Sequence, residues 1–123
     1  MTGALQDIAA ITSYHAHIYY DPAATREAAA RIRDAIGARF PAAQLGRWHD
    51  VPVGPHSIAM YQVAFGVEDF PRLVPWLMLN RGELVILVHP NTDDEYEDHA
   101  HHAVWLGAKL PLRLEVLKKP GQA

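Results

Sequence analysis

The chain has 123 residues, of which half are hydrophobic and 20% are charged, and its net charge is −3 with neutral histidines. This length supports one domain with one hydrophobic core, and the slightly acidic charge argues against nucleic-acid binding. The absence of cysteine excludes disulfides, thiolate catalysis and cysteine zinc sites. No apolar run approaches the roughly 18 residues that span a bilayer, and the N-terminal segment lacks the features of a signal peptide. We expect a soluble, cytoplasmic protein with a single domain over residues 1–123.

The first half of the chain predicts an arm, a strand and a helix. Residues 1–12 are weakly patterned, and we expect them to form a flexible arm. Residues 13–20 are rich in aromatic and β-branched side chains, which predicts a strand. Asp21 followed by Pro22 is typical of a helix start. The alanine-rich residues 23–40 then carry one apolar stripe. The stripe consists of Ala28, Ile32, Ala35, Ile36 and Phe40.

The middle of the chain predicts two further strands, a second helix and a buried strand. Residues 44–49 form a short candidate strand, and a turn rich in proline and glycine separates it from a third strand over residues 57–64. Residues 70–80 predict the second helix, with an irregular start because it contains two prolines. Residues 84–88 are continuously apolar, which favours a buried strand that ends at His89.

The order of these elements predicts the fold. After the second helix and the buried strand, the acidic residues 91–107 are expected to form a loop and a short helix, and residues 112–117 a final strand. The order βαββαβ is typical of an α+β, ferredoxin-like fold, with an antiparallel sheet, two helices on one face and here a C-terminal appendage. The terminal segments or a second copy of the chain would cover the other face, and we expect a homodimer.

Histidines are the most informative residues, because eight of them are spread through the chain. His15 and His17 are two residues apart on the first strand, so both side chains point to one face, with Tyr19 beside them. Ala16 and Ile18 point to the opposite face, which suits a core. Two imidazoles on one strand face can bind one metal, although a pair of half-exposed histidines is the alternative.

Two more histidines lie at the ends of neighbouring strands. His56 begins the third strand and His89 ends the fourth, and the topology places both strands beside the first. Both could therefore converge on His17. Three neutral imidazoles around one ion with open positions suit Fe(II) or Zn(II). Iron would bind a catecholate and dioxygen together, whereas zinc with a water would make a hydrolase, and residue types do not choose between them.

A third group of histidines follows a run of acidic residues. His99 and His102 are three residues apart, on one face of a helical turn, and His101 points elsewhere, toward solvent. The nearby carboxylates would favour the charged imidazolium.

Cationic and aromatic side chains add candidates for substrate contacts. Arg47 or Arg81 could bind a substrate carboxylate through two parallel hydrogen bonds. Trp48, Trp76 and Trp105 are expected to lie in the core or at an interface rather than under a substrate.

Four motifs together resemble the bacterial branch of the DOPA 4,5-dioxygenase family. They are YHAHIYYD, LGRWHDVPVGPHSIAMYQVAF, WLMLNRGELVILVHPNT and DHAHHAVWLG, and the likeness as a whole runs from Tyr14 to about Leu117. The resemblance implies a ferredoxin-like fold and extradiol cleavage of a catechol such as DOPA, with non-haem Fe(II) and O₂. The chain departs from the family pattern after HPNT, where Asp93 and Asp94 stand in place of Gly-Asp. The added negative charge could change which substrate is accepted.

The resemblance also implies roles for particular residues. The family's histidines match His17, His56, His89, His99 and His102, while His15 matches the bacterial form of the first motif and His49 a more variable position. We expect His17, His56 and His89 to hold the iron, with Asp50 or Asp98 as an alternative third ligand. His15 or His102 would remove the catechol proton, with His99 as a further catalytic candidate. Arg47, Arg81 and Tyr19 would contact the substrate.

Two other classes of function remain open. The first is a non-catalytic dimeric domain whose histidines sense pH or bind metal. The second is a zinc-dependent hydrolase or isomerase, indifferent to oxygen. The fold cannot choose among them, because this topology carries many functions.

Overall fold

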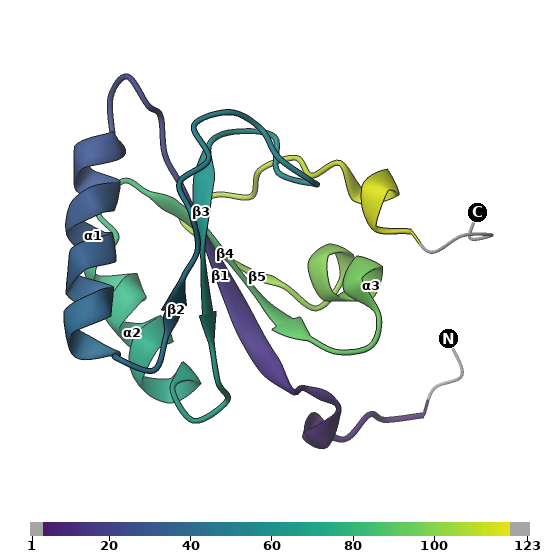
Figure 1. Cartoon of the computed structure of the whole chain (residues 1–123). Coiled ribbons are helices and arrows are strands. Elements are labelled where there is room, and N and C mark those ends of the chain that lie inside the picture. Colours follow the sequence, from purple (N-terminus) through teal and green to yellow (C-terminus); the bar gives the residue numbers. More distant parts are fainter. Residues whose placement is uncertain (1–3, 119–123) are drawn as a thin grey trace.

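The computed structural model describes residues 4–118, which form an open antiparallel sheet with two helices on one side and one on the other (Figure 1). The strands are β1 (Ser13–Tyr19), β2 (Gln44–Leu45), β3 (Met60–Phe65), β4 (Val85–Asn91) and β5 (Val104–Leu106). The helices are α1 (Arg26–Arg39), α2 (Phe70–Asn80) and α3 (Glu95–Ala100), with short 3₁₀ turns η1 (Ile8–Ala10) and η2 (Leu114–Leu117).

The strand order confirms the predicted fold class. The five strands lie in the order β2-β3-β1-β4-β5, and all neighbouring pairs are antiparallel. The first four reproduce the ferredoxin-like arrangement, with β1 in the middle between β3 and β4. Strand β5 extends the sheet beyond β4. The central position of β1 matters for function, because side chains from both neighbours meet those of β1.

The main core lies between the sheet and helices α1 and α2. Ala16 and Ile18 of β1 are fully buried there, as predicted, together with Ile36 of α1 and Leu73 and Leu77 of α2. The alternation of side chains along β1 sends His15, His17 and Tyr19 to the other face. Helix α2 has the bounds that the sequence predicts.

The second face of the sheet carries α3 and the segment that follows β5 (Figure 1). Tyr19, Met60 and Leu87 form a small buried cluster on this face, against Trp105 and Leu112. The chain itself therefore provides the cover that was one argument for a second copy, and the homodimer remains a prediction.

The final strand is not where the sequence pattern placed it. Residues 112–117 do not form a strand: Leu112 makes a single bridge with His56, and η2 follows. The edge of the sheet next to β4 is taken by β5, which pairs with Ile86, Leu87 and Val88. An alternating apolar pattern cannot form a strand without a neighbouring strand to bond.

Several boundaries in the first half also differ. Strand β3 begins at Met60 rather than near His56, because residues 53–58 form turns and isolated bridges instead. Helix α1 begins at Arg26, later than the predicted start at Pro22, because Asp21 and Thr25 form a hydrogen-bonded turn: Asp21 accepts from the Ala23 amide, and Thr25 Oγ1 accepts from the Asp21 amide. Strand β2 is shorter than predicted.

The structure describes only part of the predicted N-terminal arm. Of the predicted arm, residues 1–3 lie outside the described residues, and η1 forms a single turn within the remainder. Among the described residues, no helix has the length and apolar character needed to cross a bilayer.

Candidate functional site

Histidines gather on the sheet face that α1 and α2 leave free. His15 and His17 of β1 point to this face, because they alternate with the core residues Ala16 and Ile18. In the pairing of β1 with β4, His89 lies directly opposite His15. His17 and His89 then meet with their Nε2 atoms 3.0 Å apart, both almost fully buried.

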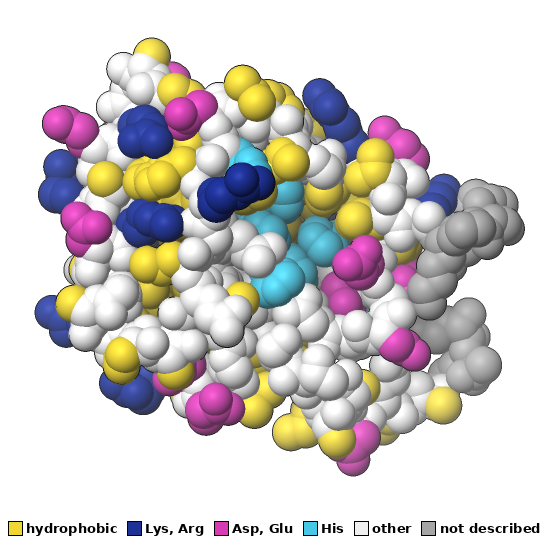
Figure 2. Space-filling view, viewed as in Figure 1, with side chains coloured by type: hydrophobic (Ala, Val, Ile, Leu, Met, Phe, Trp, Pro, Cys, Tyr) yellow, Lys and Arg dark blue, Asp and Glu magenta, His cyan; other side chains and the backbone are white. Residues whose placement is uncertain are grey.

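Two further histidines reach the cluster from outside the central strands. His56 comes from the loop before β3, and its ring centroid lies 4.1 Å from that of His17. His99 comes from α3, and its ring lies 3.9 Å from that of His89. In the space-filling view, histidine side chains gather in a hollow near the centre of the surface (Figure 2).

The cluster favours neutral imidazoles. Burial lowers the pKa of His17 well below its usual value, and the neighbouring imidazoles lower it further. Burial, then His99, lowers the pKa of His56 to about 4 and that of His89 to about 3. The same two causes lower the pKa of the partly exposed His15. At neutral pH these rings are uncharged, which is the form that binds metal ions.

Hydrogen bonds determine which nitrogen each ring presents. His89 Nδ1 bonds the Pro90 carbonyl at 2.8 Å and His99 Nδ1 bonds the Glu95 carbonyl at 2.7 Å. A carbonyl only accepts, so both Nδ1 atoms carry a proton, and in the neutral His89 ring Nε2 carries the lone pair. His17 Nε2 must therefore donate to His89 Nε2, which leaves His17 Nδ1 as a lone pair.

Nδ1 of His17, the nitrogen that these hydrogen bonds leave unprotonated, has no hydrogen-bond partner among the described residues. Within the described part of the chain, His17 Nδ1 is the one buried side-chain nitrogen or oxygen without a hydrogen bond. An unsatisfied buried lone pair costs free energy unless something binds it. Here a bound cation would satisfy it, so the residues present fit a metal ion.

Two groups of three histidines are close enough to hold an ion. The groups are His15, His17 and His89, and His17, His56 and His99, each with its ligand atoms within 4.8 Å of one another. His17 is common to both. The predicted set of His17, His56 and His89 lies within the same cluster but is divided between the two groups.

The two groups differ in how their rings are supported. Metal-binding histidines usually bond a second group through the nitrogen that does not bind the metal. His56 Nδ1 lies 2.6 Å from the Tyr19 hydroxyl, and His99 Nδ1 is held by the Glu95 carbonyl. His15 has no hydrogen bond of this kind among residues 4–118 and is only partly buried. The second group therefore fits a metal better.

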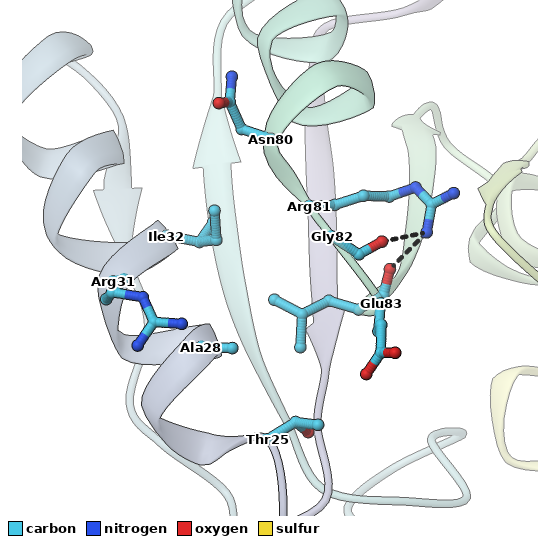
Figure 3. A pocket seen from close by; sticks show the side chains of 9 residues that line it. Thr25, Ala28, Arg31, Ile32, Asn80, Arg81, Gly82 and Glu83 are labelled. Atoms are coloured by element: carbon cyan, nitrogen blue, oxygen red, sulfur yellow. Dashed lines mark hydrogen bonds between the residues drawn. The ribbon is translucent and has the colours of Figure 1, made fainter.

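Several predicted site residues lie elsewhere. His102 and Arg47 are exposed, and His101 is exposed and paired with Glu97. Arg81 lines a different pocket, of about 280 Å³, between the start of α1 and the segment that joins α2 to β4 (Figure 3). Its guanidinium donates to the carbonyls of Gly82 and Leu84, so it holds the turn after α2.

The two carboxylates considered as metal ligands have other partners. Asp50 accepts from the Tyr20 hydroxyl at 2.6 Å and from Arg26 at 3.0 Å. Asp98 is buried and accepts from the amide and the hydroxyl of Thr92 at 2.8 and 2.6 Å. It thereby ties α3 to the turn after β4. Nothing in the residue types of the acidic run distinguishes Asp98 from its neighbours, so this role could not be predicted from the sequence.

The fold and the site define a class: a ferredoxin-like domain with a buried cluster of histidines that can hold a metal ion. The sequence model of the Dopa 4,5-dioxygenase family matches residues 14–116, and the chain belongs to this family.

Relatives and a solved structure agree with this assignment. The chain is 38% identical over 111 residues to the DOPA 4,5-dioxygenase of Amanita muscaria and 38% identical over 117 residues to an uncharacterized 21.2 kDa protein of Botryotinia fuckeliana. These matches cover 85% and 87% of this chain, but only 49% and 64% of the respective relatives. A crystal structure of a candidate dioxygenase from Nostoc punctiforme is 54% identical, with a TM-score of 0.89, over 92% of this chain and 96% of that one.

Proposed function

We propose that this protein is an extradiol ring-cleaving dioxygenase that acts on a catechol with non-haem Fe(II) and O₂. The family supports an oxygenase, and the name of the Amanita relative suggests DOPA as the first substrate to test. The observation that carries the proposal is the orphaned, buried lone pair of His17 Nδ1 within a set of uncharged imidazoles. Neutral nitrogen ligands with open positions suit a divalent iron.

His17, His56 and His99 are the ligands in this proposal. We assign His17 Nδ1, His56 Nε2 and His99 Nε2 as the metal-binding nitrogens, because the hydrogen bonds leave them free when His56 Nδ1 donates to Tyr19. His89 then supports His17 by accepting its Nε2 proton, rather than binding the metal itself. This assignment exchanges the sequence-based roles of His89 and His99.

The charge of the site favours an anionic substrate. The ligand set carries no carboxylate, so the two positive charges of a bound ion would not be neutralised by the protein. A buried charge needs a partner of opposite sign. A catechol that has lost one proton supplies an anionic oxygen with a second oxygen beside it, which suits this requirement better than a neutral substrate does.

The chain also supplies a group for proton transfer. His15 lies at the edge of the cluster, with its ring 5.1 Å from that of His89, and it is the least buried of the five imidazoles. Burial lowers its pKa, so it is neutral and can accept the catechol proton. When bound, Fe(II) would let the catecholate and O₂ react at one centre. His15 would hold the proton during ring opening and return it to the product.

The test is reconstitution with Fe(II) under anaerobic conditions, followed by aerated DOPA, catechol and 4-methylcatechol. We expect oxygen uptake and a yellow, ring-opened product that depends on iron. Protein loaded with Zn(II) is the matched control and should give neither. Hydrolase activity with zinc and no response to oxygen would support the zinc enzyme instead, and absence of metal binding would favour the sensing domain.

A further inference from the structure

Tyr19 is placed by the fold to control one of the proposed metal ligands. It follows His15 and His17 in the same alternation on β1 and is 2% exposed. Its ring stacks on Trp105 with the centroids 5.9 Å apart, and it packs with Met60 and Leu87. A side chain this deeply buried has little room to contact a substrate, which was its role in the sequence-based expectation.

The hydroxyl of Tyr19 has a single partner. It lies 2.6 Å from His56 Nδ1, and no other hydrogen bond involves it in the described part of the chain. Burial raises the pKa of the phenol, so it remains neutral and adds no charge to the site. When His56 Nδ1 donates to this oxygen, Nε2 is the nitrogen left for a metal.

His56 depends on this contact more than the other cluster histidines depend on theirs. It lies in a loop, held by isolated bridges with Val53 and Leu112 rather than within a strand. His89 and His99 bond backbone carbonyls through Nδ1, and the backbone places those carbonyls whatever the side chains are. His56 has only a side chain to bond.

From this geometry we infer that Tyr19 is a positioning residue that holds the His56 ring with Nε2 toward the cluster. In this role Tyr19 sets the affinity of the site for a divalent metal, an inference that rests on the proposed function. Removing the hydroxyl takes away the partner of His56 Nδ1 and frees the ring to rotate. Loss of such a supporting hydrogen bond typically weakens metal binding by about 10- to 100-fold.

The experiment titrates Co(II) into chelator-treated full-length protein and follows the visible absorption of the bound ion. In the Tyr19→Phe variant we expect about 10- to 100-fold weaker binding at an unchanged stoichiometry. Tyr61→Phe is the matched control. Tyr61 is also fully buried, but its hydroxyl donates to the Ala29 carbonyl in the helix-covered core. This variant loses a comparable hydrogen bond and should bind Co(II) like the wild type.

A second measurement uses the unsubstituted protein. In Zn(II)-loaded protein, nitrogen NMR should show His56 protonated at Nδ1, with a proton that exchanges slowly with water. Co(II) affinity in Tyr19→Phe equal to that of the wild type, or a His56 protonated at Nε2, would overturn the role of Tyr19 and leave the dioxygenase proposal standing. Wild-type protein that binds no Co(II) would overturn both.

Discussion

His17 and His89 meet Nε2 to Nε2 across the neighbouring strands β1 and β4, at a distance of 3.0 Å. Only one proton fits between the two nitrogens. The Pro90 carbonyl binds His89 at Nδ1, so the shared proton belongs to His17. One backbone carbonyl at the end of β4 thus determines, through two rings, that His17 presents Nδ1 as a free lone pair.

The central place of His17 leads to a prediction about metal content. His17→Ala should abolish metal binding, because both candidate groups contain this residue. The measurement is bound metal per chain after reconstitution and gel filtration. His101→Ala, which changes an exposed histidine, is the control and should retain the metal. If His89→Ala lost the metal completely and His99→Ala retained it, the group with His15 would be the metal site.

The effect of substitutions on kcat distinguishes the two candidates for proton transfer, His15 and His102. His15→Gln should lower kcat by about 10²- to 10⁴-fold while metal content stays near that of the wild type, because a general base contributes a factor of this size. His102→Gln should leave kcat nearly unchanged, since this side chain is exposed and outside the cluster. Steady-state oxygen uptake with a catechol measures both. The reverse order of effects would contradict the assignment of His15.

The metal-free protein should lose stability in mild acid. The pKa of His56 is lowered from 6.5 to about 4 and that of His89 to about 3, by burial first. The unfolded chain therefore takes up protons that the folded chain does not, so the histidine contribution is complete above pH 6.5 and is lost as the pH falls toward 4. Each such histidine contributes a slope of up to about 1.4 kcal/mol per pH unit.

Urea unfolding in the presence of a chelator, at a series of pH values across this range, measures the slope. His56→Gln is the informative variant, because it removes one of the buried titrating groups and should make the slope shallower. Identical slopes for this variant and the wild type would show that His56 is not held neutral by the fold.

The buried carboxylate of Asp98 provides a test of how α3 is attached. Asp98→Ala should lower the free energy of unfolding by about 1–3 kcal/mol, because the Thr92 amide loses its acceptor. It should also weaken metal binding, since α3 carries His99. Asp93→Ala, at an exposed position in the same acidic run, is the control and should change neither quantity. If the metal affinity were unchanged in Asp98→Ala, the hydrogen bonds between Asp98 and Thr92 would not be needed to position His99.

Much of the fold followed from local pattern. Alternation along residues 13–19 assigned Ala16 and Ile18 to the core and His15 and His17 to the opposite face, because side chains of a strand must alternate. The bounds of α2 followed from its apolar periodicity and the turn signal after it. The order of these elements was sufficient for the fold class, since connection rules leave few arrangements.

The tertiary structure decided which histidines form the site and what each one does. Contacts with Tyr19, Pro90 and Glu95 determine which ring nitrogen of each histidine is hydrogen-bonded and which is free. No periodicity in the sequence predicts these contacts. His99 joins the cluster and His102 does not, although the sequence pattern placed both on one helical face, because α3 ends at Ala100 and His102 lies beyond it. The sequence alone determined that imidazoles would line one face of the sheet. Their protonation and partners depend on distances that only the packed chain defines.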